Sequence, residues 1–440
     1  MPKLLLKATS NPLVSRIRRL DQLLDKLCLI PEQETTGDAV RNQANSLMPK
    51  PCDNWDELIH TWNKAMKWNE GLDIALSVML SCCVSTMAVG DQLWIKIVGP
   101  PSCGKSTLCE AISVATKYVY AKSTFRGFHS GAGDGVEDHS LISKVSGKTL
   151  VCKDGDTLLQ SPNLSQILSE ARDIYDTVSR TSYRNKASKD YSGIRMTWIL
   201  AGTRSLRLID ASELGERFLD CIMMDGIDDD MEDEVLMSVA DRVDRNMSIE
   251  AHEGSSIQYE PAMIDAMQRT GGYVVYLRTN ARDLLSGVSM SRDAKLTCAR
   301  LGKLVAYMRA RPSKDHNEKA EREFAARLTS QLTRLAKCLA VVLNYNEVNE
   351  QVLYRVRKVA LDTARGVSLD IVDQLHRVPT GMEVRAIQLY TGKKEEAVRD
   401  TLAFLISLGA VTTLASTGAG SYRYKLSDRF KVLYTEGYGL

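Results

Sequence analysis

A glycine-rich stretch at residues 97–113, IVGPPSCGKSTLCEAIS, has the residue types and spacing of a loop that holds phosphate. It fits the pattern G-x-x-x-x-G-K-[ST], in which backbone N–H groups point at phosphate oxygens. An apolar segment precedes the loop and an amphipathic segment follows it. We therefore expect a strand before it and, after it, a helix N-terminus with its partial positive charge. The residues of this predicted phosphate loop are Gly99, Pro100, Pro101, Ser102, Cys103, Gly104, Lys105, Ser106 and Thr107.

Two side chains of the phosphate loop have specific roles in this chemistry. Lys105 is expected to reach the β- and γ-phosphates, and the hydroxyl of Ser106 is expected to bind Mg²⁺. The sequence therefore predicts binding of a nucleoside triphosphate, with ATP and Mg²⁺ as the expected ligands.

Two carboxylates, Asp154 and Asp156, lie in the segment KTLVCKDGD farther along the chain. Phosphoryl transfer needs an acid in the Mg²⁺ shell and a residue that orients the attacking water. The usual motif places Asp-Glu after four hydrophobic residues, but Gly155 takes the Glu position if Asp154 binds the metal. If Asp154 instead polarises water, the metal position is Lys153. We favour Asp154 on the metal, with Asp156 as the second acid; a helix-capping turn without a catalytic role is the alternative.

Two further polar residues flank later apolar segments. MTWILAGT ends in Thr203, which we expect to contact the γ-phosphate or the attacking water. Arg217 directly precedes the segment FLDCIMM, where an arginine would point out of its own subunit toward a neighbour's nucleotide. An arginine finger of this kind contributes about 10³- to 10⁵-fold in rate. A surface salt bridge is the alternative role of Arg217.

Strands that alternate with helices must position these residues. Over residues 91–225 apolar segments alternate with amphipathic ones, which predicts a mostly parallel sheet with helices on both faces. Residues 231–366 show helical apolar spacing. The last part of the chain gives three short helical segments and two β-prone runs around a Gly/Ser turn, the outline of a winged helix. The expected strands are residues 91–99, 118–125, 148–154, 196–202 and 217–225.

The ordered series GPPSCGKST, KTLVCKD, ILAGT and LGERFLD, followed by helices and a winged-helix outline, resembles the AAA+ ATPases. The segment LGERFLDCIMM resembles the arginine-finger segment of minichromosome-maintenance-type helicases, and residues 321–362 resemble their lid helices. The early arginine that serves as sensor 2 in those helices corresponds to Arg327. The chain is also similar to AAA+ ATPases of phages and mobile elements that carry a C-terminal winged helix. The resemblance extends over residues 70–440.

The resemblance implies an α/β fold, with a P-loop αβα AAA+ core, an all-α lid and a C-terminal winged-helix domain. We therefore expect a helical N-terminal region over residues 1–90, the ATPase core over 91–230, the lid over 231–366 and the winged helix over 367–440. The implied metal ligands are Ser106 and Asp154. The implied catalytic residues are Asp154, Asp156, Thr203, Arg217 and Arg327.

A basic, β-prone segment precedes the fourth expected strand, at TVSRTSYRNKASKDYSGIRMTW. At this position the helicases that the chain resembles carry a β-hairpin that projects into a central pore and grips the DNA backbone. Tyr183 or Tyr191 is a candidate for stacking on a base. A solvated loop that happens to be basic is the alternative. The expected phosphate contacts are Arg180, Arg184, Lys186 and Lys189.

Composition limits the partners and the compartment. The formal net charge is +2, so contact with nucleic acid has to be local rather than spread over a basic surface. The ten cysteines include no CxxC pair and no zinc spacing, which favours buried thiols in a reducing cytosol. The apolar stretch at residues 76–89 is too short to cross a membrane. We expect a cytoplasmic protein, in a bacterial host if phage-encoded, without a membrane partner.

Taken together, the motifs and the resemblance predict an ATP-driven, ring-forming motor that acts on DNA as a homo-hexamer. We expect a replicative helicase or helicase-like translocase of a phage or mobile element, with other replication proteins as partners. The first alternative is a slow ATP switch, such as an initiator, helicase loader or regulator, which the irregular acid motif favours. In either case the winged helix binds DNA or another protein. A nucleotide-sensing signalling ATPase without a DNA partner is a third possibility.

Overall fold

The computed structural model describes residues 47–130, 138–182, 188–208, 217–224, 229–247, 260–310, 323–364, 366–415 and 422–438. Two of the expected DNA contacts, Arg184 and Lys186, lie outside the described residues, as do the stacking candidate Tyr183 and residues 1–46 of the expected N-terminal region. No helix in the described ranges combines the length and the apolar character that a membrane span requires.

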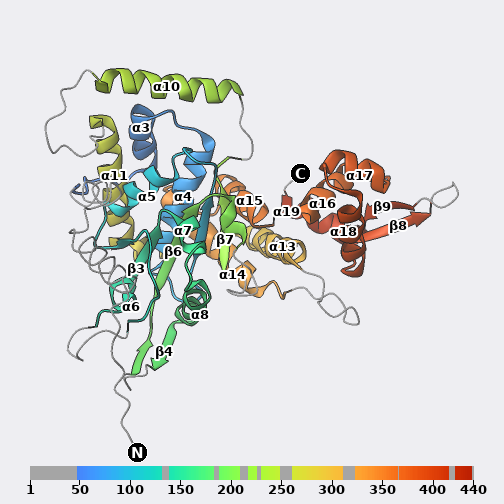
Figure 1. The fold of residues 1–440 in the computed structure, drawn as a ribbon, viewed down its shortest axis with the longest axis horizontal. Coiled ribbons are helices and arrows are strands. Elements are labelled where there is room, and N and C mark those ends of the chain that lie inside the picture. The colour runs from blue at the N-terminus through green and yellow to red at the C-terminus, as the bar shows by residue number, and fades with distance from the viewer. Residues whose placement is uncertain are drawn as a thin grey trace, which may run out of the picture.

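A five-stranded sheet forms the centre of the molecule, with strand order β2-β3-β6-β1-β7 (Figure 1). All of its pairings are parallel, which confirms the predicted parallel sheet. The strands are nearly continuous apolar runs, as expected where both faces of a sheet are covered. Their bounds are β1 (Trp94–Val98), β2 (Val119–Ala121), β3 (Lys148–Cys152), β6 (Met196–Gly202) and β7 (Phe218–Ile222).

The strand order places β1, which leads into the phosphate loop, between β6 and β7. The chain crosses from β1 to the far edge at β2, returns through β3 to β6, and then passes over β1 to β7. In open α/β sheets, ligands bind at the carboxyl ends of strands where the connections diverge in this way. The phosphate loop follows β1 at such a point.

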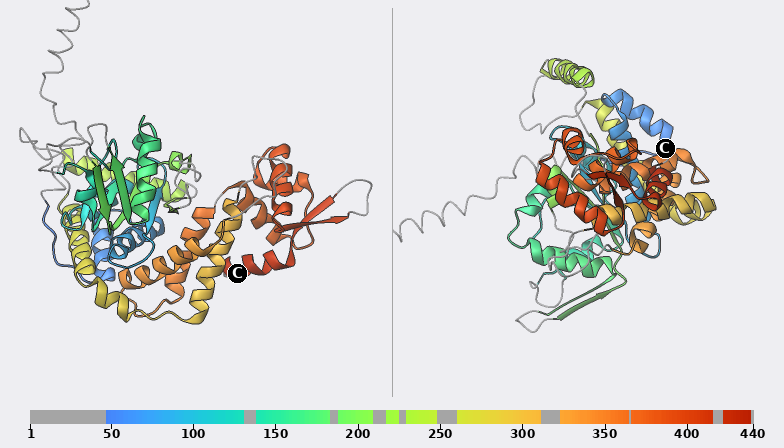
Figure 2. Two further views of the ribbon diagram at one scale, coloured as in Figure 1. Left: turned by 90° about the horizontal axis from the view of Figure 1, so that it is seen from below. Right: turned by 90° about the vertical axis from the view of Figure 1, so that its right-hand side faces the viewer.

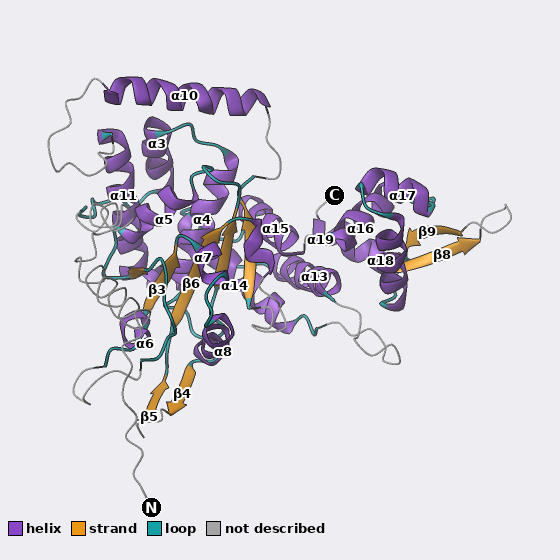
Figure 3. Ribbon diagram, viewed as in Figure 1, coloured by secondary structure: helices purple, strands orange, loops and turns teal. Residues whose placement is uncertain are grey.

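Helices cover both faces of the sheet (Figure 3). Because side chains alternate along a strand, two separate apolar clusters form. Ile95 and Ile97 point to the face that α4 and α5 cover, whereas Trp94 and Trp198 point to the face that α6, α7 and α8 cover. The bounds are α4 (Glu70–Ser85), α5 (Lys105–Ser113), α6 (Leu141–Val145), α7 (Gly155–Leu159) and α8 (Leu164–Tyr175).

Helix α4 is apolar on nearly all sides because it lies between the sheet and α14 (Ala326–Val342). It begins at the N-cap Asn69, whose side chain accepts a hydrogen bond from the N–H of Leu72. Helix α3 (Trp55–Ala65), with Asn54 as its N-cap, packs against α11 (Pro261–Thr279). Within residues 47–90, both helices are therefore part of the same packed body as the sheet.

The chain after β7 forms a helical layer beside the sheet. Helix α15 packs on β7 at its edge, and α11 packs on α5. The same apolar cluster continues from the sheet through these helices, so they share one core with it. The remaining bounds in this layer are α10 (Asp229–Met247), α12 (Ala281–Gly287), α13 (Arg292–Arg309) and α15 (Glu350–Ala364).

The C-terminal elements lie to one side of the sheet (Figure 2). Three helices precede an antiparallel hairpin, and the final helix α19 packs back on α13, where the rings of Tyr307 and Phe430 meet edge to face at 5.1 Å. Helix α19 therefore fastens this part to the helical layer. The bounds are α16 (Val367–Arg377), α17 (Val384–Thr391), α18 (Glu395–Ser407), β8 (Val411–Ala415), β9 (Tyr422–Leu426) and α19 (Asp428–Tyr438).

A second antiparallel pair, β4 (Val178–Ser182) and β5 (Ser188–Ser192), connects the end of α8 to the start of β6. It lies near the amino ends of the sheet strands and projects away from the sheet (Figure 1). A short 3₁₀ turn, η1 (Arg204–Leu208), follows β6 at the opposite edge.

Candidate functional site

The phosphate loop lies between the carboxyl ends of two neighbouring strands. The N–H of Gly99 donates to the carbonyl of Gly202 on β6 at 3.2 Å, and the N–H of Met223 donates to the carbonyl of Val98 at 2.9 Å. Helix α5 begins at Lys105, so residues 99–104 form the whole connection. The loop is thus held on both sides by the sheet, as the sequence predicts for a strand-loop-helix unit.

Two residues of the loop have left-handed backbone conformations, Ser102 with φ of 65° and Gly104 with φ of 91°. Left-handed residues of this kind turn successive N–H groups into the concave side of a loop, where they bind anions. Gly104 is also the N-cap of α5 and carries no side chain that could satisfy the first helical N–H groups. A Cβ at Gly99 would lie 2.7 Å from Sγ of Cys103, so both glycines are required by the fold of the loop.

The Lys105 side chain bends back over the phosphate loop. Its ammonium donates to the carbonyls of Gly99 at 2.9 Å and Pro100 at 2.5 Å, and the residue is only 8% exposed. Ser106, in contrast, is exposed in the first turn of α5. For Lys105 to reach a phosphate, the ammonium has to exchange these carbonyls for phosphate oxygens.

A cavity of about 220 Å³ lies over the phosphate loop and the first turn of α5. Helix α10 contributes Val235, Ser238 and Val239 to it, and Met66, Lys67 and Met263 line it as well. Ligand pockets usually measure about 300–1,000 Å³, so this volume suits phosphate groups rather than a whole nucleotide. The base and ribose would have to extend beyond it or displace α10.

The two candidate acids have different partners. Asp154 is exposed and caps α7, where it accepts hydrogen bonds from the N–H of Thr157 at 3.4 Å and from its hydroxyl at 2.5 Å. Asp156 accepts from the N–H of Thr203 at 2.8 Å and from its hydroxyl at 3.1 Å. The structure therefore brings Asp156 and Thr203 together beside Gly202, while Asp154 has the capping role that the sequence left open.

The intervening Gly155 could not be the water-polarising glutamate of the usual motif. A Cβ at Gly155 would lie 2.7 Å from side-chain atoms of both Leu200 and Leu206. The position before Asp154 is equally unsuited to a metal, because the ammonium of Lys153 pairs with Glu110 of α5 at 2.9 Å. Sequence reasoning missed Glu110, whose only indication was an acidic residue in an otherwise apolar stretch of helix.

The donor set near the loop fits Mg²⁺. Mg²⁺ prefers oxygen ligands and keeps several waters, so it is usually held by one or two carboxylates together with substrate phosphates. The exposed hydroxyl of Ser106 and the exposed carboxylate of Asp154 are of this type, and a carboxylate that caps a helix keeps further lone pairs. Both predicted ligands are therefore chemically suited to the ion.

The sequence predicts that Arg217 points out of its own subunit, but the structure shows the side chain packed against its own chain. It is 8% exposed, its guanidinium pairs with Asp176 at 3.0 Å, and it stacks over the ring of Tyr175 at 5.2 Å. Arg327, in the first turn of α14, lies over the same ring at 6.0 Å. The structure thus gathers the two predicted arginines around Tyr175, which sequence reasoning did not foresee. Burial raises the pKa of the Tyr175 hydroxyl well above its ordinary value.

This arginine pair lies near the amino ends of the sheet strands, whereas the phosphate loop lies at their carboxyl ends. Arg217 directly precedes β7, whose first residue Phe218 pairs with Trp94. The register therefore places Arg217 level with Leu93, about 20 Å along the strands from Gly99. Neither arginine can contact a nucleotide held by the loop of its own chain.

The β4–β5 hairpin has a charge-compensated stem. Arg180 faces Asp190 across the two strands and pairs with it at 3.0 Å, both side chains being well exposed. The hydroxyl of Tyr191 donates to Asp138 at 2.9 Å, so this ring is tied to the body of the protein. Lys189 lies in β5. The charge of Arg180 is therefore compensated within the stem, and Lys189 is the other basic residue of the two described strands.

No protein-family model matches the sequence, and no curated protein matches it significantly. The geometry described above is therefore the basis for assigning a function.

Proposed function

We propose that this protein is an AAA+ ATPase that binds ATP and Mg²⁺ on residues 99–107 and hydrolyses the nucleotide between neighbouring copies of the chain. The observation that carries the proposal is the phosphate loop itself. Its left-handed Ser102 and Gly104 lie at the carboxyl end of the central strand β1, beside the linked pair Asp156 and Thr203. Backbone donors, a lysine, a hydroxyl and carboxylates thereby meet at one edge of the sheet, as triphosphate chemistry requires.

The arginine pair supports hydrolysis across a subunit boundary. Arg217 and Arg327 lie about 20 Å from their own loop, at the opposite edge of the sheet, so only a neighbouring copy can present a phosphate to them. Arg217 would have to leave Asp176, whose carboxylate is 59% exposed and readily solvated. A ring of such copies, with six as the expected number, places each nucleotide between two chains.

The elements after β7 support the remaining parts of the proposal. Helices α10 to α15 are the proposed lid, because they follow β7 along the chain and α10 lines the cavity over the phosphate loop. Helices α16 to α18 with β8 and β9 have the order of a winged helix. The projecting β4–β5 hairpin is the expected DNA contact, which makes a helicase or helicase-like translocase of a phage or mobile element the preferred role.

A slow ATP switch that assembles on DNA is the second candidate, because one observation favours it. The site lacks the usual pair of adjacent acids. Asp154 caps α7, and position 155 has no room for a side chain. An initiator or helicase loader needs nucleotide-dependent assembly but little turnover. The comparison of ATP turnover with strand unwinding separates the two roles.

The test of the proposal is ATP binding by wild type and by Lys105→Ala, measured by calorimetry with Mg²⁺. We expect the variant to bind about 10- to 100-fold more weakly, because charge-assisted hydrogen bonds to the phosphates are lost. Lys295→Ala, at an exposed position on α13, is the matched control and should bind as wild type. Equal affinity of all three proteins would reject the phosphate-loop assignment. Turnover with and without single-stranded DNA, alongside unwinding, then distinguishes motor from switch.

A further inference from the structure

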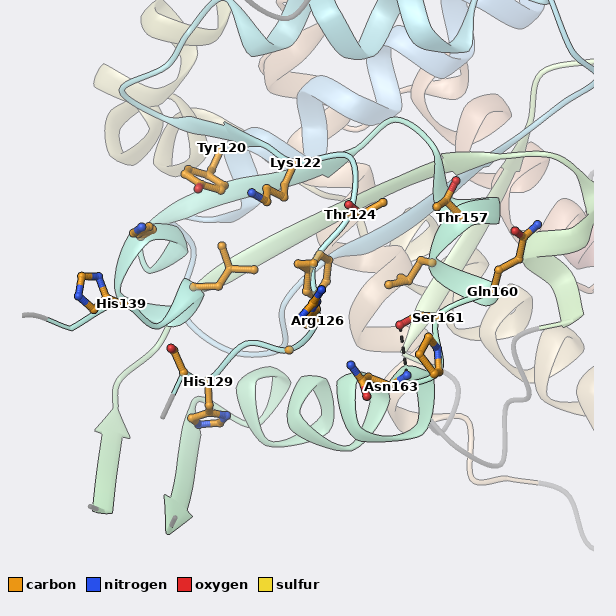
Figure 4. Close-up of a pocket in the computed structure, with 17 residues that line it drawn as sticks. Tyr120, Lys122, Thr124, Arg126, His129, His139, Thr157, Gln160, Ser161 and Asn163 are labelled. Atoms are coloured by element: carbon orange, nitrogen blue, oxygen red, sulfur yellow. Dashed lines mark hydrogen bonds between the residues drawn. The ribbon is translucent and has the colours of Figure 1, made fainter. Parts of the chain in front are cut away.

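A second, larger cavity lies on the other side of the acid motif from the phosphate loop. Its volume is about 940 Å³, and it extends from the end of β2 to the segment that joins α7 and α8 (Figure 4). Tyr120 and Lys122 lie on one side of it, Thr157 and Asn163 lie on the opposite side, and Arg126 lies between them. None of residues 99–107 lines it, so it is separate from the phosphate loop.

The charge of the cavity wall is strongly one-sided. Lys122, Arg126 and Lys144 line it together with His129 and His139, and none of the described lining residues is acidic. Within the described ranges, no ion pair joins any of these three lysine and arginine side chains to a carboxylate, whereas other cations of the sheet region, such as Lys153 and Arg217, are paired. Three uncompensated cations around one hollow attract a ligand that carries negative charge.

Aromatic and hydrogen-bonding groups accompany these cations. The rings of Tyr120 and Phe125 are only partly buried and line the cavity, where a planar base could stack on them. Thr157, Gln160 and Asn163 add neutral donors and acceptors on the opposite side. This combination suits a nucleotide unit, because cations bind its phosphate and aromatic rings stack on its base.

The wall is fixed rather than loosely arranged. Glu170 of α8 accepts hydrogen bonds from the N–H groups of Phe128 at 2.6 Å and His129 at 3.3 Å. Phe128 itself is fully buried against Trp198 of β6. His129 also contacts the hydroxyl of Ser179 at 3.1 Å, which joins the cavity wall to the root of the β4–β5 hairpin.

We propose that this cavity binds a nucleoside-phosphate unit, with the phosphate on Lys122, Arg126 and Lys144 and the base against Tyr120 and Phe125. The unit comes either from a free nucleotide or from a single-stranded nucleic acid. The volume of this cavity is within the range of ordinary ligand pockets, about 300–1,000 Å³, and accommodates a complete nucleotide. The proposal does not rest on ATP binding at the phosphate loop, because the two sites share no residue.

The test is a fluorescence anisotropy titration of the full chain with a short fluorescent oligothymidylate, with thymidine 5′-monophosphate as the competitor. We expect the double variant Arg126→Ala/Lys144→Ala to bind the probe about tenfold more weakly. The slope of log affinity against log salt should fall by up to about 0.7, the value for one lost phosphate contact on a single strand. Tyr120→Leu should weaken binding, whereas Tyr120→Phe, which retains the ring, should not.

Two control variants locate the effect. Lys295→Ala removes an exposed cation far from the cavity and should bind as wild type. Lys105→Ala should retain affinity for the probe, which separates this site from the phosphate loop even if ATP binding is lost. Displacement of the probe by the monophosphate identifies a free-nucleotide site, and its failure to compete identifies a strand site. Wild-type affinity in the double variant for both ligands would overturn the proposal.

Discussion

Asp156 at the start of α7 holds Thr203 at the end of β6 through two hydrogen bonds, 2.8 Å to the N–H and 3.1 Å to the hydroxyl. Since Gly202 accepts a hydrogen bond from Gly99, this link reaches the phosphate loop directly. We expect Asp156→Ala to lower ATP turnover by about 10²-fold or more, with nucleotide affinity changed far less. Steady-state turnover and calorimetry measure the two quantities. Wild-type turnover in Asp156→Ala would remove Asp156 from the catalytic residues, whereas Thr203→Ser should keep most activity.

The cap role and the metal role of Asp154 can be separated by two substitutions. Asn is as good an N-cap as Asp, so Asp154→Asn should keep the stability of α7, while Asp154→Ala should lose about 1 kcal/mol. If the carboxylate also binds Mg²⁺, both variants should need more Mg²⁺ for half-maximal turnover. Chemical denaturation and a Mg²⁺ titration provide the measurements. An unaltered Mg²⁺ requirement in Asp154→Asn would leave Asp154 with the cap alone.

The ion pair between Arg217 and Asp176 allows the finger role to be tested against a purely structural one. We expect Arg217→Ala to keep ATP binding and lose about 10³-fold in turnover. Asp176→Ala breaks the same pair but leaves the guanidinium, so its turnover should stay near or above that of wild type. Mixing wild type with Arg217→Ala should depress turnover more than simple dilution does. Equal losses in the two variants would identify the pair as structural.

Two left-handed glycines form a matched pair for the backbone of the phosphate loop. Gly104 has φ of 91° and Gly147, far from the loop, has φ of 76° with open space around its Cβ position. Alanine at either position should cost about 1–2 kcal/mol in the free energy of unfolding, because the left-handed conformation is unfavourable with a side chain. Only Gly104→Ala should also lose ATP affinity. Unimpaired binding by Gly104→Ala would show that the N–H groups of the loop do not hold the phosphates.

Glu170 predicts a pH dependence of stability. Burial raises the pKa of its carboxyl, but hydrogen bonds from His129, Gln166 and the N–H of Phe128 outweigh burial and lower the pKa overall. A folded-state pKa below the unfolded one means that the stabilisation is complete above the ordinary value of 4.5 and is lost as the pH falls through the folded pKa. Glu170→Gln should therefore be less stable than wild type at neutral pH.

Denaturation of both proteins between neutral and acidic pH measures this effect. The difference in free energy of unfolding should be about 1 kcal/mol at pH 7 and should shrink below the ordinary glutamate pKa. Glu57→Gln, at an exposed position on α3, is not a neutral control because Glu57 pairs with Arg269. Glu396, exposed on α18, is the better site for the control substitution Glu396→Gln. A gap that stays constant with pH would contradict the assigned charge state of Glu170.

The sheet was accessible to prediction because each strand is an apolar run bounded by polar or glycine residues. Four of the five expected strands lie close to their observed bounds, whereas β2 stops at Ala121, where the polar residues Lys122 to Thr124 begin. Lys122 and Thr124 line the second cavity instead. The phosphate loop was equally accessible, since its pattern is local and its flanks agree with it.

Long-range relationships were beyond the sequence. The insertion of β6 between β3 and β1 depends on crossover connections, which no local pattern encodes. The packing of Arg217 on Tyr175 joins residues from separate segments, so an exposed orientation was expected from sequence position alone. The ion pair between Lys153 and Glu110 likewise links two elements, and it explains why a lysine is tolerated beside the acid motif.

The phosphate loop lies at the carboxyl ends of the sheet strands, and the arginine pair lies near their amino ends. Each copy of the chain therefore has a loop end and an arginine end. A contact that joins the loop end of one copy to the arginine end of the next can be repeated head to tail, or it can be made twice, reciprocally, in a twofold-symmetric dimer whose interface includes both ends. Copies added in this head-to-tail manner either close on themselves or continue as a helical filament, according to the rotation between successive copies. In the proposed head-to-tail assembly, the last copy of an unclosed chain of subunits would keep one unmatched loop, and closure would complete one additional site.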